Sequence, residues 1–180
     1  MSAGAERGVP PRLVPDEPLP PYAYVAGRSP HPVSDPAGHS HGVPPSHPPP
    51  PDPGRWWECR PYLRGIDLFN GGYYWEAHEA WEGLWHACGR AGPTADFLKG
   101  LIRLAAAGVK AREGRPEGVR SHARRAAELF RSLAAGRDPG ETHFMGLPLA
   151  ELEGFAASLT ERLEWPVDTV LGFFLRPEHG

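Results

Sequence analysis

The chain has 180 residues, a length typical of a single domain, and 40% of them are hydrophobic. Its net charge is −3, which argues against a nucleic-acid or membrane partner because both attract a surplus of basic residues. No apolar run reaches transmembrane length, and no secretory signal is visible. Cys59 and Cys88 lack the spacing of a metal site or a disulfide framework. We therefore expect a cytoplasmic protein with reduced thiols.

Proline and polar residues dominate the N-terminal part of the chain. Most of the 23 prolines precede Gly54, and the stretch GHSHGVPPSHPPPPDP has almost no large apolar side chain. Such a segment buries too little surface to offset its ordering entropy. We therefore predict that residues 1–54 form a disordered tail, locally polyproline II, and that residues 55–180 form the folded domain.

The rest of the chain has helical periodicity, and no alternating pattern of useful length indicates a strand. Proline suits the first turn of a helix, and glycine suits the position after its last turn. Thr94 is expected to cap one of the helices. The sequence therefore predicts an all-α fold, a small helical bundle of about five helices built from antiparallel helical hairpins. The expected helices span about 61–71, 73–88, 94–114, 116–136 and 148–166.

The second expected helix contains the stretch EAHEAWEGLWH, residues 76–86. At about 100° per residue its apolar side chains form one stripe that includes Trp81, which we assign to the core. His78, Glu79 and Glu82 lie on the opposite side of the helix, with Glu76 on one flank. His78 and Glu82 are one turn apart, so their side chains are neighbours.

This polar group has three possible roles. His78 and Glu82 could chelate zinc, iron or manganese, since imidazole and carboxylate ligands suit these ions. The group could instead be a solvated helix face. The third possibility is a buried cluster paired with Lys99 or Arg103 of the next helix. We favour this third role, in which a polar pocket without a tightly held metal is formed by Glu76, His78, Glu79 and Glu82.

Trp75 and Trp85 lie off the apolar stripe of the same helix. Two indoles left in water would form a sizeable apolar patch. We expect a further helix or a second subunit to cover them, and we favour a subunit interface. The sequence therefore predicts a homo-oligomer.

The stretches LFNGGYYWEAHEAWEGLW and FLKGLIRLAAAGVKAREGRPEGVRSHARRAAELF occur in this order in the chain. They resemble family 309 of the domains of unknown function, a family of bacteria and archaea. The resemblance covers roughly residues 60–134 and implies a small all-α bundle with no established activity. His86, Lys99 and Arg103 depart from the family pattern. The pattern is matched at Glu76, His78, Glu79 and Glu82.

Two functions of different classes are compatible with these observations. The first is a non-catalytic binding or interaction module for a protein or small-molecule partner. The alternative is a hydrolase-like, metal-dependent enzyme with His78 and Glu82 as ligands and Glu79 as base. We expect no cofactor other than a possible divalent metal.

Overall fold

The structure is a computed structural model that describes residues 8–178. Within these residues the chain is mostly helical, so the prediction of a helical fold is confirmed. The structure adds a small antiparallel sheet that pairs Phe144 with Leu147 through a turn at Met145 and Gly146. In chain order the elements are η1 (Pro53–Glu58), α1 (Arg60–Asn70), α2 (Tyr74–Ala87), α3 (Pro93–Arg112), α4 (Pro116–Ala135), β1 (His143–Phe144), β2 (Leu147–Pro148) and α5 (Leu149–Glu161).

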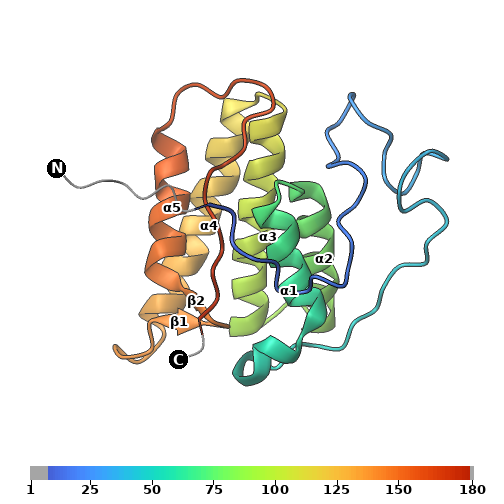
Figure 1. Cartoon of the computed structure of the whole chain (residues 1–180). Coiled ribbons are helices and arrows are strands. Elements are labelled where there is room, and N and C mark those ends of the chain that lie inside the picture. The colour runs from blue at the N-terminus through green and yellow to red at the C-terminus, as the bar shows by residue number, and fades with distance from the viewer. Residues whose placement is uncertain (1–7, 179–180) are drawn as a thin grey trace.

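Each α-helix packs against its neighbour in the sequence, from α1 on α2 to α4 on α5. Figure 1 shows α5 at one end of this row and α1 and α2 at the other. Residues 162–178 then cross from the end of α5 over the row, descend along it and end beside the small sheet (Figure 1), where the N–H of Glu178 donates to the carbonyl oxygen of Gly146. None of the described helices combines the length and the apolarity that crossing a membrane requires.

Proline and glycine determine most of the helix bounds. Pro93 and Pro116 are the first residues of α3 and α4, where a missing N–H leaves no hydrogen bond unmade. Gly92, with φ of 90°, is the N-cap of α3, and as a glycine it has no side chain to supply a cap bond. Thr94 therefore lies within the first turn, and the prediction that it caps this helix is wrong.

Trp81 of α2 is fully buried, as its place in the apolar stripe predicts. Its indole lies against α1 at Gly65, where an added Cβ would be 2.5 Å from the indole Cε2 and closer still to Nε1. The indole Nε1 donates a hydrogen bond to the carbonyl oxygen of Tyr62 at 3.3 Å. The absence of a side chain at Gly65 therefore sets how closely α1 and α2 approach.

The structure does not confirm a disordered tail for residues 8–54. Apart from η1 they form no regular element, yet they lie along α1 and α2 (Figure 1) and bury Val14 and Val25. Buried carboxylates of the helices accept main-chain N–H groups of this segment, which offsets part of its ordering entropy. Residues 1–7 of the predicted tail lie outside the described residues.

The C-terminal segment, residues 162–178, is attached to α1 and α2 in a similar way. Asn70 donates from Nδ2 to the carbonyl oxygen of Leu175 at 2.9 Å and accepts its N–H at 2.7 Å. The Tyr74 hydroxyl accepts the N–H of Leu171 at 2.9 Å. The ring of Phe173 stacks on Phe155 of α5 with centroids 4.0 Å apart. Helix α5 ends at Glu161, before the bound expected at residue 166.

Candidate functional site

His78, Glu79 and Glu82 of α2 converge on one another. Each offers a ligand atom, and these atoms all lie within 4.8 Å of one another. The His78 Nδ1 atom is 3.3 Å from the Glu79 Oε1 atom, within ion-pair distance. The same Nδ1 is buried and has no partner with hydrogen-bond geometry, so the contact is one of proximity. His78 and Glu82 are half-buried and Glu79 is exposed. We call these three residues the α2 cluster.

Glu76 lies apart from this cluster and faces the N-terminal segment. Its side chain is 5% exposed, and its Oε1 atom accepts the N–H of Tyr24 at 2.9 Å. The same oxygen is 3.1 Å from Nε2 of His39, whose side chain is 7% exposed. The ring of Tyr22 lies 4.8 Å from the His39 ring. The structure therefore brings together three of the four residues of the predicted pocket and places the fourth elsewhere.

A cavity of about 560 Å³ lies beside the α2 cluster, between α1, α2 and the proline-rich segment. Glu79 and Glu82 line it. Two arginines of α1, Arg60 and Arg64, also line it, and both are bonded to Glu17. Among the described residues Glu82 has no ion-pair partner, so its carboxylate is available to a cationic ligand on the α2 side of the cavity.

The basic residues of α3 do not pair with the α2 cluster in the described part of the chain. A guanidinium nitrogen of Arg103 lies 3.4 Å from Nδ1 of His122 on α4. Lys99 Nζ lies 5.9 Å from the ring centroid of Trp85. The expected ion-pair network between α2 and α3 is therefore replaced by contacts with an imidazole and an indole.

Burial lowers the pKa of His122, and the nearby charges of Arg103 and Lys110 lower it further. On acidification, the His122 imidazole is therefore protonated in the unfolded chain, at a pH near 6.5, before it is protonated in the folded protein. We therefore expect the free energy of unfolding to fall as the pH decreases from about 6.5 towards the lowered pKa, and to be unaffected by this group at higher pH.

Urea unfolding at a series of pH values between 7.5 and 5 would measure this effect. His122→Gln should make the pH dependence shallower, and Arg103→Gln should do so to a smaller extent because burial still acts on the imidazole. Equal pH dependence in the parent and in His122→Gln would contradict the assignment.

The two tryptophans proposed for an interface both have partners within the chain. The Trp75 ring makes edge contacts with Tyr24 and His31, each with centroids 5.4 Å apart. Arg90 lies over the Trp85 ring at 5.4 Å from its centroid. The cover over Trp75 comes from the N-terminal segment, which is neither of the two sources expected from the sequence. The homo-oligomer stays a prediction.

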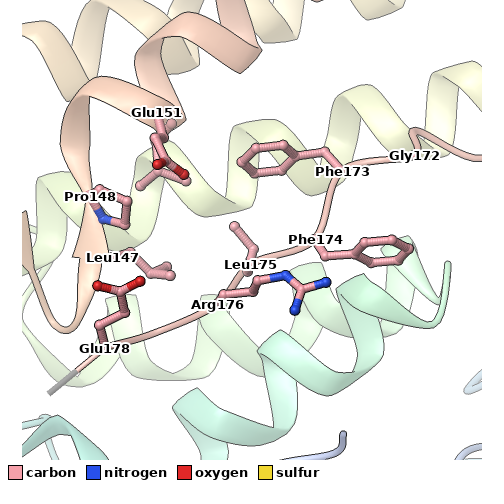
Figure 2. A pocket seen from close by; sticks show the side chains of 10 residues that line it. Leu147, Pro148, Glu151, Gly172, Phe173, Phe174, Leu175, Arg176 and Glu178 are labelled. Atoms are coloured by element: carbon pink, nitrogen blue, oxygen red, sulfur yellow. The ribbon is translucent and has the colours of Figure 1, made fainter. Parts of the chain in front are cut away.

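A second cavity, of about 450 Å³, lies between α5 and the C-terminal segment. Figure 2 shows Glu151 of α5 on one side of it, with Phe173 and Arg176 of the C-terminal segment on the other. No residue of the α2 cluster lines this cavity. Of these two cavities, the one beside α2 is therefore the one lined by predicted carboxylates, Glu79 and Glu82.

Sequence reasoning overlooked Asp67, which is 4% exposed and accepts two main-chain N–H groups. Its signal was a single acidic residue within the apolar run Ile66–Phe69 of an amphipathic helix. It also overlooked Tyr24 and His39, because nothing local marks a residue of an irregular segment as the partner of a distant carboxylate.

The family model described as "Domain of unknown function (DUF309)" matches residues 62–122. None of the curated proteins matches the chain. The matched stretch runs from α1 into α4 and contains the α2 cluster as well as Asp67, Asn70 and Glu76. The resemblance to family 309 of the domains of unknown function is therefore confirmed over residues 62–122.

Proposed function

We propose that the domain is a non-catalytic binding module and that its α2 cluster holds a divalent cation such as Zn²⁺ or Mn²⁺. The observation that carries this proposal is the convergence of ligand atoms from His78, Glu79 and Glu82 within 4.8 Å. One imidazole nitrogen and two carboxylate oxygens suit both ions. The lack of a hydrogen-bond partner for the buried His78 Nδ1 further supports a role as ligand.

The cavity beside the α2 cluster supports a binding function in particular. Three protein ligands leave coordination positions open, and Glu79 and Glu82 both border the cavity. A molecule with an oxygen or nitrogen donor could therefore bind the cation from the cavity. The cation would then link the protein to a small-molecule partner.

The alternative, a metal-dependent hydrolase, requires Glu79 to act as a base towards a bound water. Its carboxylate lies 3.3 Å from the His78 imidazole and belongs to the convergent group. This placement favours Glu79 as a third ligand over a free base, and so favours binding over hydrolysis. Glu79→Gln separates the two roles, since loss of a ligand weakens cation affinity, whereas loss of a base lowers only turnover.

Calorimetric titration of the metal-free protein with Zn²⁺ and with Mn²⁺ tests the proposal. We expect one site, with affinity reduced at least about tenfold in His78→Gln and Glu82→Gln, because even residues that only support metal ligands have effects of that size. Bound cation should also raise the free energy of unfolding by about 2.7 kcal/mol at a hundred times its Kd.

Glu128→Gln is the matched control, since Glu128 is an exposed glutamate on α4. It should leave cation affinity unchanged. The proposal fails if the parent binds neither ion at millimolar concentration, or if the α2 variants bind as tightly as the control.

A further inference from the structure

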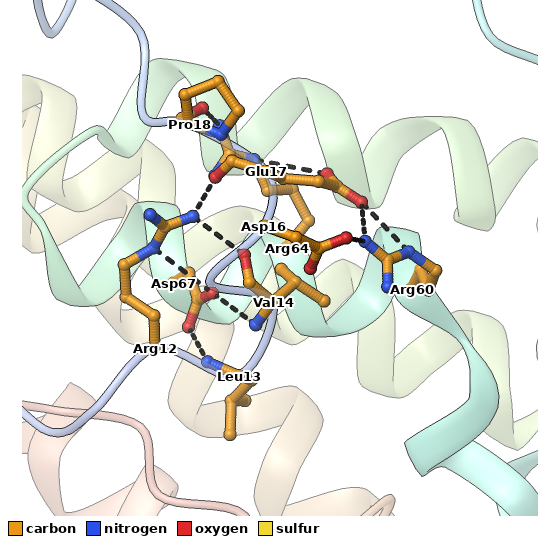
Figure 3. A network of polar contacts seen from close by, with 9 residues as sticks. All are labelled: Arg12, Leu13, Val14, Asp16, Glu17, Pro18, Arg60, Arg64 and Asp67. Atoms are coloured by element: carbon orange, nitrogen blue, oxygen red, sulfur yellow. Dashed lines mark hydrogen bonds and ion pairs between the residues drawn. The ribbon is translucent and has the colours of Figure 1, made fainter.

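The carboxylate of Asp67 on α1 binds two consecutive main-chain amides of the N-terminal segment. Its Oδ1 atom accepts the N–H of Leu13 at 2.8 Å, and its Oδ2 atom accepts the N–H of Val14 at 2.9 Å (Figure 3). The Asp67 side chain is 2% exposed. Because these bonds are made to the backbone, they recognise two consecutive free N–H groups. The chain turns directly after them, where the N–H of Glu17 donates to the carbonyl oxygen of Val14 at 3.1 Å.

Two arginines continue this recognition along α1. Arg64 donates to the carbonyl oxygens of Glu17 and Pro18, and Arg60 donates to the carboxylates of Asp16 and Glu17 (Figure 3). Residues 60, 64 and 67 are three or four positions apart, so they form one stripe along the helix. The segment therefore runs antiparallel to α1, with its amides at Asp67 and its acidic residues at the arginines.

The side chains of the segment divide into an anchor and an exposed part. Val14 is 2% exposed and packs in the apolar core, whereas Leu13 is 39% exposed. Pro15 follows Val14 within this turn, at the position where the fixed φ of proline suits a β-turn, and Pro18 follows the turn. One aliphatic residue, followed by proline and then by acidic residues, is therefore the pattern that this face of α1 accommodates.

A second group of contacts holds the segment on α2. The Glu76 carboxylate accepts the N–H of Tyr24 at 2.9 Å, and the neighbouring Val25 is 5% exposed. The Tyr24 ring packs on Trp75. The segment is bound on α2 in the same way as on α1: a buried carboxylate accepts a main-chain N–H, and an aliphatic side chain next to that amide is buried.

The connection that joins this segment to the helices takes little part in these contacts. Residues 41–47 are all exposed, and a Cβ added at Gly42 would meet nothing within 4 Å. The segment is therefore a ligand-like stretch on an exposed tether.

We propose that α1 and α2 form a peptide-binding groove, defined by Arg60, Arg64, Asp67, Trp75 and Glu76, which the chain's own residues 12–25 occupy in cis. In trans the groove takes a peptide of the same chemistry, with a turn in which an aliphatic residue is followed by proline and an acidic pair. The tether gives the cis segment an effective concentration in the millimolar range, so it blocks the groove against peptides at lower concentration. The groove shares no residue with the α2 cluster, although Arg60 and Arg64 also line the cavity beside that cluster.

The test uses the full chain with a protease recognition sequence inserted between Gly42 and Val43, within the exposed tether. After cleavage we expect the N-terminal fragment to co-elute with the helices in size-exclusion chromatography. A fluorescent peptide of residues 8–30 should then exchange into the cut protein, and should bind the uncut protein at least about a hundredfold more weakly because the tethered segment competes.

The matched controls alter only the hydrogen bonds between Asp67 and the peptide backbone. A peptide with N-methyl groups on Leu13 and Val14 lacks the two donors that Asp67 accepts and should bind at least about tenfold more weakly. The cut Asp67→Asn variant should show a similar loss for the unmodified peptide, and Glu128→Gln should show none. A dimer of uncut chains that dissociates when the peptide is added would place the segment in the groove of a second copy and would also support the proposal.

Failure of the peptide to bind the cut protein, or equal binding of the N-methylated peptide, would overturn the proposal. If loss of the fragment unfolds the helices, the added peptide should restore a cooperative unfolding transition. Absence of that rescue would overturn it as well.

Discussion

Replacing Trp81 by alanine should lower the free energy of unfolding by about 3–5 kcal/mol. The indole is fully buried, its ring centroid lies 6.0 Å from that of Phe69, and its Nε1 donates to the Tyr62 carbonyl oxygen. Its removal leaves a large cavity between α1 and α2 and removes the indole hydrogen bond to the Tyr62 carbonyl oxygen. Urea unfolding followed by circular dichroism would measure the loss.

Trp57→Ala is the matched control for this substitution. Trp57 is 44% exposed, and its ring packs beside Trp56 with centroids 5.7 Å apart. We expect a loss of no more than about 1 kcal/mol at this site. A similar loss for the two variants would show that Trp81 is not the centre of the packing between α1 and α2.

Two glycine-to-alanine substitutions should have effects of opposite sign. In Gly65→Ala the new Cβ would overlap the Trp81 indole, and such overpacking costs about 1–3 kcal/mol of unfolding free energy. In Gly154→Ala the new Cβ would meet nothing within 4 Å on an exposed turn of α5. Alanine has the higher helix propensity, so this variant should gain about 0.5–1 kcal/mol.

Thermal and urea unfolding of the two variants beside the parent would test this pair. Because the chemical change is the same, the comparison isolates the close approach of α1 and α2. Stabilisation by Gly65→Ala would mean that the helices can separate there at no cost.

The helices could be predicted from the sequence because their signals are local. Pro93 and Pro116 start α3 and α4, and Gly71 and Gly136 follow the ends of α1 and α4. The burial of Trp81 followed from helical periodicity alone. The small sheet was not predicted, because two pairs of residues are too few to produce an alternating pattern.

The candidate site was predicted only in part, and Glu76 shows why. Periodicity places Glu76 on the flank of α2, but it cannot say what covers that flank. The cover comes from Tyr24 and His39, residues 52 and 37 positions earlier in an irregular segment. His78, Glu79 and Glu82 converge because they share one helix, which is a local relation that the sequence does contain.

The composition of the N-terminal segment predicted disorder because the segment by itself buries too little apolar surface to offset its ordering entropy. Residues 8–54 contain few apolar side chains, and their order depends on acceptors supplied by α1 and α2. A composition argument treats the segment as if it were alone. That argument could not account for Asp67 and Glu76. The shortest contacts of their buried carboxylates are made with main-chain N–H groups of the segment and not with cationic side chains.

The order in which the chain is synthesised gives this attachment a further consequence. The N-terminal segment leaves the ribosome before α1 exists, since Asp67 follows Val14 by 53 residues, and the bonds of Asn70 must wait a further 105 residues for Leu175. Until Asp67 and Glu76 have been synthesised, the amides of Leu13, Val14 and Tyr24 lack the carboxylates that accept them in the folded protein. A proline-rich, weakly apolar stretch stays soluble and forms no competing strand during that delay. The composition that resembles disorder therefore suits a segment that must remain unpaired in the nascent chain and dock only after the helices have assembled.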